Sequence, residues 1–237
     1  MWNVENGALL YTFEGHSKPV RSVCWASDGQ TIASGSHDHT VRLWDAVAAK
    51  CRFVLYAGSA VNMVAICKAQ PTVEGITYEG IVAGGSVNGY VKLWDIRTGS
   101  LVKCLDNPDG GEYGVYGVAF SYNRTWNDTL LVAGFENQVK TWWLGRDLKR
   151  THDGHRGIFH GVTFLPTTPF FVSASRDGCV AIWDYNRGKP SALLRLNYSG
   201  QTISAVAEAP GGSVFAIATS EGTVRLWSLH HRSTGIY

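Results

Sequence analysis

The 237-residue sequence predicts an all-β fold of four-stranded antiparallel sheets, or blades, arranged radially around an axis. A tryptophan-centred pentapeptide of the form Val-Arg-Leu-Trp-Asp recurs five times, and Trp2 marks the end of an earlier copy. Successive repeat tryptophans stand 42, 50, 48, 41 and 44 residues apart, close to the roughly 40 to 45 residues of one blade. The repeat tryptophans are Trp2, Trp44, Trp94, Trp142, Trp183 and Trp227. The 27 glycines fit a fold with many tight turns, so we expect a β-propeller with five blades present.

The first full repeat shows how the chain forms one blade. Residues 20–25 alternate as an inner strand, Asp28-Gly29 makes a turn, and residues 31–36 form the second strand. A short turn at residues 37–40 leads to the third strand, which ends at Trp44, and residues 51–56 supply the outer strand. We expect the same four strands in each later repeat.

These repeats resemble those of the WD40 family. The resemblance implies a structural tetrad in which a histidine links a turn aspartate to a strand serine, and the serine accepts the buried tryptophan indole N–H. Two repeats carry the full set, namely His16, Ser34, Asp38 and Trp44, and His155, Ser173, Asp177 and Trp183. The other three replace its serine and aspartate by Gly84 and Asn88, Val132 and Glu136, and Ile217 and Glu221. We expect those three blades to depend more on apolar packing and to open more easily.

The two ends of the repeat array raise the question of ring closure. Residues 8–13 read as an outer strand without a blade, and few residues remain after Trp227 to give the last blade its fourth strand. One expectation is that the N-terminal strand pairs with the last blade and closes a five-blade ring. The other follows from the family resemblance, which implies seven blades: residues 1–237, a single propeller domain, would then be the C-terminal five blades of a larger propeller. An open arc would expose apolar faces and self-associate.

Composition narrows the classes of partner. The 21 Lys and Arg nearly balance the 19 Asp and Glu, and their scatter argues against direct nucleic-acid binding. No apolar stretch approaches the roughly 18 residues of a membrane helix. Five cysteines without a Cys-x-x-Cys pair, and an N-terminus unlike a signal peptide, predict reduced thiols in an intracellular protein.

The repeat register nominates a binding surface at the mouth of the central channel. One position at the start of each inner strand, here called the strand ring, comprises Arg21, Asn62, Tyr116, His160 and Ser204. The residue before each tight-turn acid or its substitute, the turn ring, comprises His37, Val87, Phe135, Arg176 and Ser220. Tyr, Phe and Arg are enriched at interface hot spots, so we expect these rings to bind short segments of other proteins.

At the level of subfamily, the chain resembles the propeller of Tup/Groucho-type transcriptional corepressors. The residues that carry the resemblance are Ala83 to Ser86, Trp94 to Val102, the Gly- and Asp-rich segment from Asp106 to Gly114 before Val115 to Phe120, and Gly154 to Arg156. The resemblance implies a nuclear scaffold that binds peptide segments of regulators; a cytoplasmic scaffold is the alternative location. A rival function follows from Trp94-Asp95-Ile96-Arg97, which resembles the adaptor-docking motif of cullin-RING ligase substrate receptors.

Metal binding, phosphate binding and catalysis are weaker expectations than protein binding, and no catalytic residue is predicted. His37-Asp38-His39 invites a metal interpretation, but the tetrad already uses Asp38 and no third ligand is placed nearby. The glycines from Gly110 to Gly117 lack the lysine and spacing of a phosphate loop. Two long loops, residues 67–79 and residues 122–129 with Trp126, are surface excursions or additional binding loops. We therefore expect a non-enzymatic interaction module without metal or cofactor.

Overall fold

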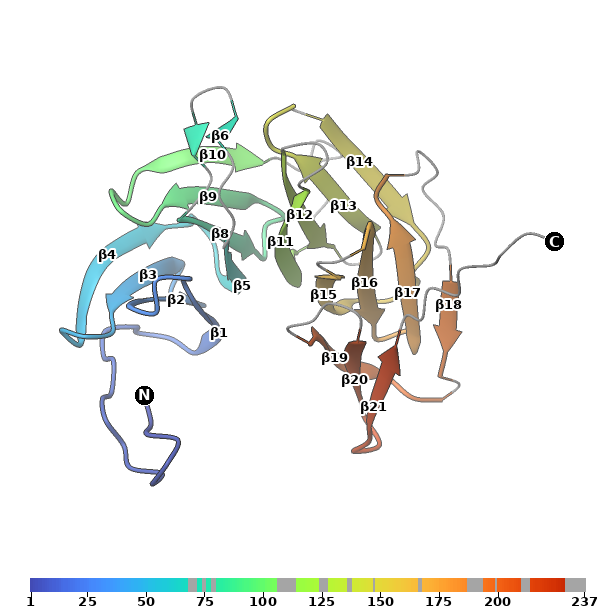
Figure 1. Cartoon of the computed structure of the whole chain (residues 1–237), viewed down its shortest axis with the longest axis horizontal. Coiled ribbons are helices and arrows are strands. Elements are labelled where there is room, and N and C mark those ends of the chain that lie inside the picture. The colour runs from blue at the N-terminus through green and yellow to red at the C-terminus, as the bar shows by residue number, and fades with distance from the viewer. Residues whose placement is uncertain are drawn as a thin grey trace.

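The structure is a computed structural model that describes residues 1–67, 72–73, 76–77, 80–105, 114–123, 128–135, 138–146, 148–165, 168–186, 194–198, 200–209 and 214–228. Within these ranges the regular elements are β-strands (Figure 1). The described residues include no helix long and apolar enough to cross a membrane. Trp126 and the segment from Asp106 to Tyr113 lie outside the described residues.

Four sheets have four antiparallel strands each, which confirms the predicted blade. The first blade contains β1 (Val20–Trp25), β2 (Thr31–Ser36), β3 (Thr40–Asp45) and β4 (Lys50–Tyr56). The second contains β5 (Val61–Ile66), β8 (Ile81–Ser86), β9 (Val91–Asp95) and β10 (Leu101–Leu105). The third contains β11 (Gly117–Asn123), β12 (Asp128–Gly134), β13 (Gln138–Trp143) and β14 (Leu148–Asp153).

The fourth blade contains β15 (Phe159–Leu165), β16 (Phe170–Ser175), β17 (Cys179–Asp184) and β18 (Leu194–Asn197). The fifth is a three-stranded sheet of β19 (Ile203–Glu208), β20 (Val214–Thr219) and β21 (Val224–Ser228). Within the predicted 67–79 loop, β6 (Thr72–Val73) pairs with β7 (Ile76–Thr77) as a separate ribbon.

The core lies at the joints between blades. Val41 and Leu43 of the first blade pack in one buried cluster with Val61 and Val64 of the second. A β-carbon on Gly35 would lie 2.7 Å from Val61 Cγ1 and 2.8 Å from Val64 Cγ1, so glycine permits this close approach. This joint therefore combines the second and third strands of the first blade with the inner strand of the second.

The five blades follow an arc, with the first and last blades at its two ends (Figure 1). Residues of β1, β5, β11, β15 and β19 all line one central cavity of 430 Å³. Inside it, the Thr163 hydroxyl of the fourth blade contacts the Glu208 carboxylate of the fifth. The inner strands thus line a common cavity on the inside of the arc.

The N-terminal strand does not close the ring, which corrects the first expectation above. The fifth blade, as described, contains only β19, β20 and β21, and Leu9 forms an isolated bridge with Trp2 instead. Phe13 packs against Trp44 with ring centroids 5.6 Å apart. Residues 8–13 therefore lie beside the first blade, where Tyr11 and Phe13 line the same cavity as Val20, Val23 and Trp44.

The third blade differs from the others by one residue in its tight turn. The strand-ladder partners Gly35 and Val41, Gly85 and Val91, Ala174 and Val180, and Ala218 and Val224 are each separated by six positions. The corresponding pair in the third blade, Gly134 and Val139, is separated by five. Counting back from the tryptophan therefore misaligns this blade: Ala133, not Val132, takes the place of Ser34.

Candidate functional site

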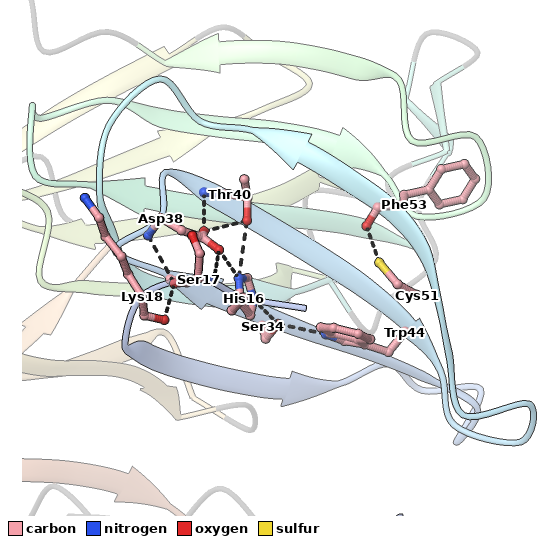
Figure 2. A network of polar contacts seen from close by, with 10 residues as sticks. His16, Ser17, Lys18, Ser34, Asp38, Thr40, Trp44, Cys51 and Phe53 are labelled. Atoms are coloured by element: carbon pink, nitrogen blue, oxygen red, sulfur yellow. Dashed lines mark hydrogen bonds and ion pairs between the residues drawn. The ribbon is translucent and has the colours of Figure 1, made fainter. Parts of the chain in front are cut away.

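The two predicted tetrads form hydrogen-bonded chains. In the first blade, His16 Nδ1 lies 2.7 Å from Asp38 Oδ2, His16 Nε2 lies 2.7 Å from Ser34 Oγ, and Trp44 Nε1 donates to Ser34 Oγ at 2.8 Å (Figure 2). Figure 2 also shows Thr40 beside the turn, where its hydroxyl donates to Asp38 Oδ1 at 2.6 Å. The chain therefore ties the segment before β1 to the turn and to the third strand.

The fourth blade repeats this arrangement. His155 Nε2 lies 2.8 Å from Ser173 Oγ, and Trp183 Nε1 donates to the same oxygen at 2.7 Å. His155 Nδ1 lies 3.2 Å from Asp177 Oδ2. Burial alone would raise the pKa of Asp177, but hydrogen bonds from His155, Arg156 and Cys179 lower it to about 2. In the first blade, Asp38 has a lowered pKa for the same reason, with Thr40 and His16 outweighing burial.

A metal-ligand cluster coincides with the second tetrad. His155, Asp177 and Cys179 bring a ring nitrogen, a carboxylate oxygen and a sulfur within 4.8 Å of one another. Both ring nitrogens of His155 already have hydrogen-bond partners, and Thr40 occupies the position of Cys179 in the first blade. The cluster is therefore accounted for by the structural network.

Two of the blades that lack the tetrad use other polar contacts that the sequence did not reveal. In the fifth blade, Trp227 Nε1 donates to the Tyr198 hydroxyl at 2.8 Å, and Arg225 lies over the Tyr198 ring. In the third blade, buried His152 Nε2 lies 3.0 Å from Thr141 Oγ1. These polar contacts accompany the apolar packing on which we expect the two blades to depend more than the others.

His152 also joins the third blade to the fourth. Its ring meets Phe171 and Trp183 edge-on, at centroid distances of 5.3 and 5.5 Å. Burial, and then the nearby positive charge of Arg150, lower the pKa of His152 to about 4, with Asp153 opposing the shift. A neutral imidazole therefore fills this joint at neutral pH.

The strand ring occupies a special backbone position. In four blades the ladder between the inner and second strands is irregular at one point, between Val20 and Ser22 and at the corresponding places. The residues left outside the regular pairing at these points are Arg21, Asn62, His160 and Ser204. In the third blade, Tyr116 stands directly before β11, and its N–H donates to the Gly134 carbonyl. A β-bulge redirects a side chain, so the bulge sets these residues apart from their neighbours.

The turn ring is held beside the strand ring by a recurring backbone bond. His37, Val87, Arg176 and Ser220 donate their N–H groups to the carbonyls of Pro19, Ala60, Ile158 and Thr202. The side chains of Arg21, His160, Arg176 and Ser204 are exposed, whereas His37, Asn62 and Tyr116 are half-buried. We call this surface, which the strand and turn rings share, the top face.

Phe135 does not belong to the top face. Its side chain is 2% exposed, and its ring lies 6.3 Å from that of Trp142. Because the turn of the third blade is one residue shorter, Phe135 takes the place of buried Ser36 rather than that of His37. The neighbouring Glu136 lies outside the described residues.

Polar contacts join the two rings. His37 Nε2 lies 3.3 Å from Asn62 Oδ1, and Asn62 Nδ2 donates to the Val115 carbonyl at 3.0 Å, so three blades are linked. Burial, and then the charge of Arg176, lower the pKa of His160. Next to Ser220 of the turn ring, Gln201 Nε2 donates to Glu221 Oε2 at 2.6 Å.

The arginines of the two rings, Arg21 and Arg176, give the rings a basic character.

On another side of the blades, Arg97 folds back onto its own repeat. Its guanidinium Nη2 lies 3.0 Å from Asp95 Oδ2, and the backbone N–H of Arg97 donates to Asp95 Oδ1 at 2.7 Å. The Arg97 side chain is 69% exposed. It borders a cavity of 170 Å³ together with Ala26 to Asp28. The residue is therefore accessible, and its aspartate partner orients it.

Comparison with known proteins matches three segments to the repeat family described as WD domain, G-beta repeat: residues 7–45, 146–184 and 191–228. Protein tipD from Dictyostelium discoideum is 22% identical over 233 residues, which cover 96% of this chain and 36% of that protein. Periodic tryptophan protein 2 from Arabidopsis thaliana is 23% identical over 232 residues, covering 96% and 24%.

Mitochondrial division protein 1 from Kluyveromyces lactis is 31% identical over 115 residues, which cover 43% of this chain and 16% of that protein. The chain thus spans between 16% and 36% of the length of these three relatives. The matched segments at residues 7–45 and 146–184 contain the two complete tetrads.

Proposed function

We propose, from the premise that the chain is built of WD40 repeats, that it is a non-enzymatic scaffold whose top face binds short segments of other proteins. The observation that supports this most directly is the β-bulge at the start of four inner strands, which sets Arg21, Asn62, His160 and Ser204 apart at corresponding places. Bulges are over-represented next to functional sites, where they redirect side chains.

The charge of the top face favours a segment that carries carboxylates. Arg21 and Arg176 are exposed, and His37 and His160 add ring nitrogens that donate hydrogen bonds. Arginine pairs with carboxylates in a bidentate geometry. An extended peptide with Asp or Glu side chains would therefore find partners around the channel mouth, while its apolar residues contact Tyr116 and Val87.

The experiment is a selection of peptides from a random library with the purified chain, followed by titration calorimetry. We expect enrichment of acidic peptides and at least a tenfold weaker affinity for Arg176→Glu, since a lost charge-assisted hydrogen bond costs about 1.5–3 kcal/mol. Arg146→Glu, at an exposed arginine outside both rings, is the matched control. Equal affinity of both variants would contradict the proposal.

The transcriptional corepressor type is the finer form of this proposal, and it rests on the family resemblance of the sequence. The names of the three relatives do not mention transcription. A corepressor scaffold would locate to the nucleus and repress a reporter gene when tethered to its promoter. If the tethered chain leaves reporter expression unchanged, the corepressor proposal is wrong, whereas the broader scaffold proposal still stands.

A second candidate, a substrate receptor of a cullin-RING ligase, is favoured by the exposed Arg97. Its Asp95 partner holds the guanidinium at the edge of the second blade. Co-purification of a ligase adaptor, lost in Arg97→Ala and kept in Arg146→Ala, would favour this function. Arg146 is an exposed arginine in the turn after β13 of the third blade, so it controls for loss of surface charge.

A further inference from the structure

The last blade leaves bare a face that the other blades cover. Val224 and Leu226 on β21 are 70% and 73% exposed. By ladder register they correspond to Val41 and Leu43 of the first blade, which are fully buried against the second. Burying such side chains stabilises a joint by about 1.5–3 kcal/mol each, so an apolar partner surface is missing here.

The first blade leaves bare the opposite half of the same joint. Val20 and Val23 on β1 are 47% and 67% exposed. The corresponding Val61 and Val64 of the second blade are buried. The first and last blades therefore carry the two complementary halves of the joint that the chain makes between its own blades.

The strands at the two ends of the arc are complementary as well. The fifth blade has three strands as described. Residues 8–13 precede the first blade in the sequence, as an outer strand precedes each later blade. Phe13 contacts Trp44 at 5.6 Å, as His152 of the outer strand β14 contacts Trp183 at 5.5 Å. Phe13 and His152 also stand at the same distance before the tetrad histidines His16 and His155. Within the described residues, the last blade thus has no fourth strand, and residues 8–13 pair with no blade.

We propose that a second copy of this chain docks head to tail on the first. Residues 8–13 of one copy add to β21 of the other as the fourth strand of its last blade. Following the β13–β14 register, Phe13 would lie opposite Val224 and Tyr11 opposite Leu226. Val20 and Val23 would then stack on Val224 and Leu226, and strand addition would supply main-chain hydrogen bonds.

A cavity at the docking surface fits this occupant. Beside the first blade, 380 Å³ of space is lined by Trp2, Tyr11, Phe13, Val20 and Val23, among others. Its lining is apolar like the internal joints, and a sheet face carrying Val224 and Leu226 has the chemistry to fill it. Because the two faces differ, the contact is heterologous, and each copy keeps one free face for a further copy.

The test uses two charge substitutions that block one face each, Val23→Lys and Leu226→Lys, with Val47→Lys as control. Val47 is 72% exposed and lies in the turn after β3, so it belongs to neither β1 nor β21. Mass is measured by light scattering over a range of concentrations. Circular dichroism and thermal unfolding report on folding, and Val23→Thr and Leu226→Thr replace a lysine variant that fails to fold.

We expect the mass of the unmodified chain and of Val47→Lys to rise with concentration above 25.9 kDa. Val23→Lys and Leu226→Lys should each stay at 25.9 kDa alone. Their equimolar mixture should give a species of twice that mass, because each variant keeps the face that the other has lost. A monomeric unmodified chain, association of either variant alone, or a mixture that stays monomeric would overturn the proposal.

Discussion

The Tyr198 hydroxyl accepts the indole N–H of Trp227 at 2.8 Å, across the boundary between the fourth and fifth blades. Tyr198 is buried and comes just after the outer strand β18, whereas Trp227 is half-buried in β21. This bond gives the indole N–H of Trp227 an acceptor, as the tetrad serine does for Trp44 and Trp183. The repeat tryptophan of the fifth blade therefore has a hydrogen-bond acceptor although the blade has no tetrad serine.

We predict that Tyr198→Phe lowers the free energy of unfolding by about 0.5–1.5 kcal/mol, the net contribution of one hydrogen bond. The ring is retained, so its contact with Arg225 remains. Denaturant titration measures the loss, and Tyr56→Phe, at a 74% exposed tyrosine, is the control. Equal stability of the two variants would show that water replaces the hydroxyl at no cost.

We predict a larger loss for Ser173→Ala. Ser173 Oγ accepts from Trp183 and contacts His155, and the residue is fully buried. Removing it leaves a buried indole N–H without an acceptor, which costs about 1–3 kcal/mol. Ser27→Ala, at an exposed serine in the β1–β2 turn, should leave the unfolding midpoint unchanged. A smaller loss than that of Tyr198→Phe would contradict the role of the tetrad.

His152 predicts a specific pH dependence of stability. Its pKa falls from 6.5 to about 4 on folding, mainly through burial, so the unfolded chain binds this proton more readily than the folded chain. Stability from the neutral ring is complete above pH 6.5 and is lost as the pH falls toward 4, by up to about 1.4 kcal/mol per pH unit. His152→Gln cannot be protonated and should flatten the curve in this window.

The control for this effect is His39→Asn. His39 is exposed and has a φ of 72°, a conformation that asparagine tolerates. Urea titrations from pH 4 to pH 7 give the two slopes. If His152→Gln and His39→Asn retain the same slope as the unmodified chain, the joint between the third and fourth blades does not depend on a neutral imidazole.

Phe135 tests the corrected register of the third blade. As a core residue, Phe135→Ala should destabilise the fold by about 3–5 kcal/mol. Val87→Ala, at a 41% exposed position in the corresponding turn of the second blade, should cost well under 1 kcal/mol. A binding defect in Phe135→Ala without loss of stability would instead restore Phe135 to the top face.

The blades were predictable from sequence because their signals are local. The alternation of residues 20–25, the turn at Asp28-Gly29 and the spacing of the tryptophans each depend on a few neighbouring residues. Both complete tetrad sets could likewise be named, because the family resemblance supplied the pattern and the repeat spacing supplied the positions. Their geometry follows from the ladder register that places Ser34 beside Arg42, and hence near Trp44.

The predictions that were wrong or incomplete concern features that the spacing of the tryptophans does not reveal. A turn shorter by one residue moved Phe135 into the core and shifted the serine position to Ala133. Tyr198 and His152 lie in segments around outer strands, outside the repeat positions, so no motif pointed to them. The position of residues 8–13 depended on a competition between the first and the last blade, which local pattern cannot decide.

The central claim is that binding takes place on the top face. Hydrogen exchange, followed by mass spectrometry with and without a library-selected acidic peptide, tests it most directly. We predict slower exchange of the amides around Arg21, His37, Asn62, His160 and Arg176, with no change at the outer strands β4 and β14. Protection confined to the outer strands, or to the edge beside Arg97, would contradict the account.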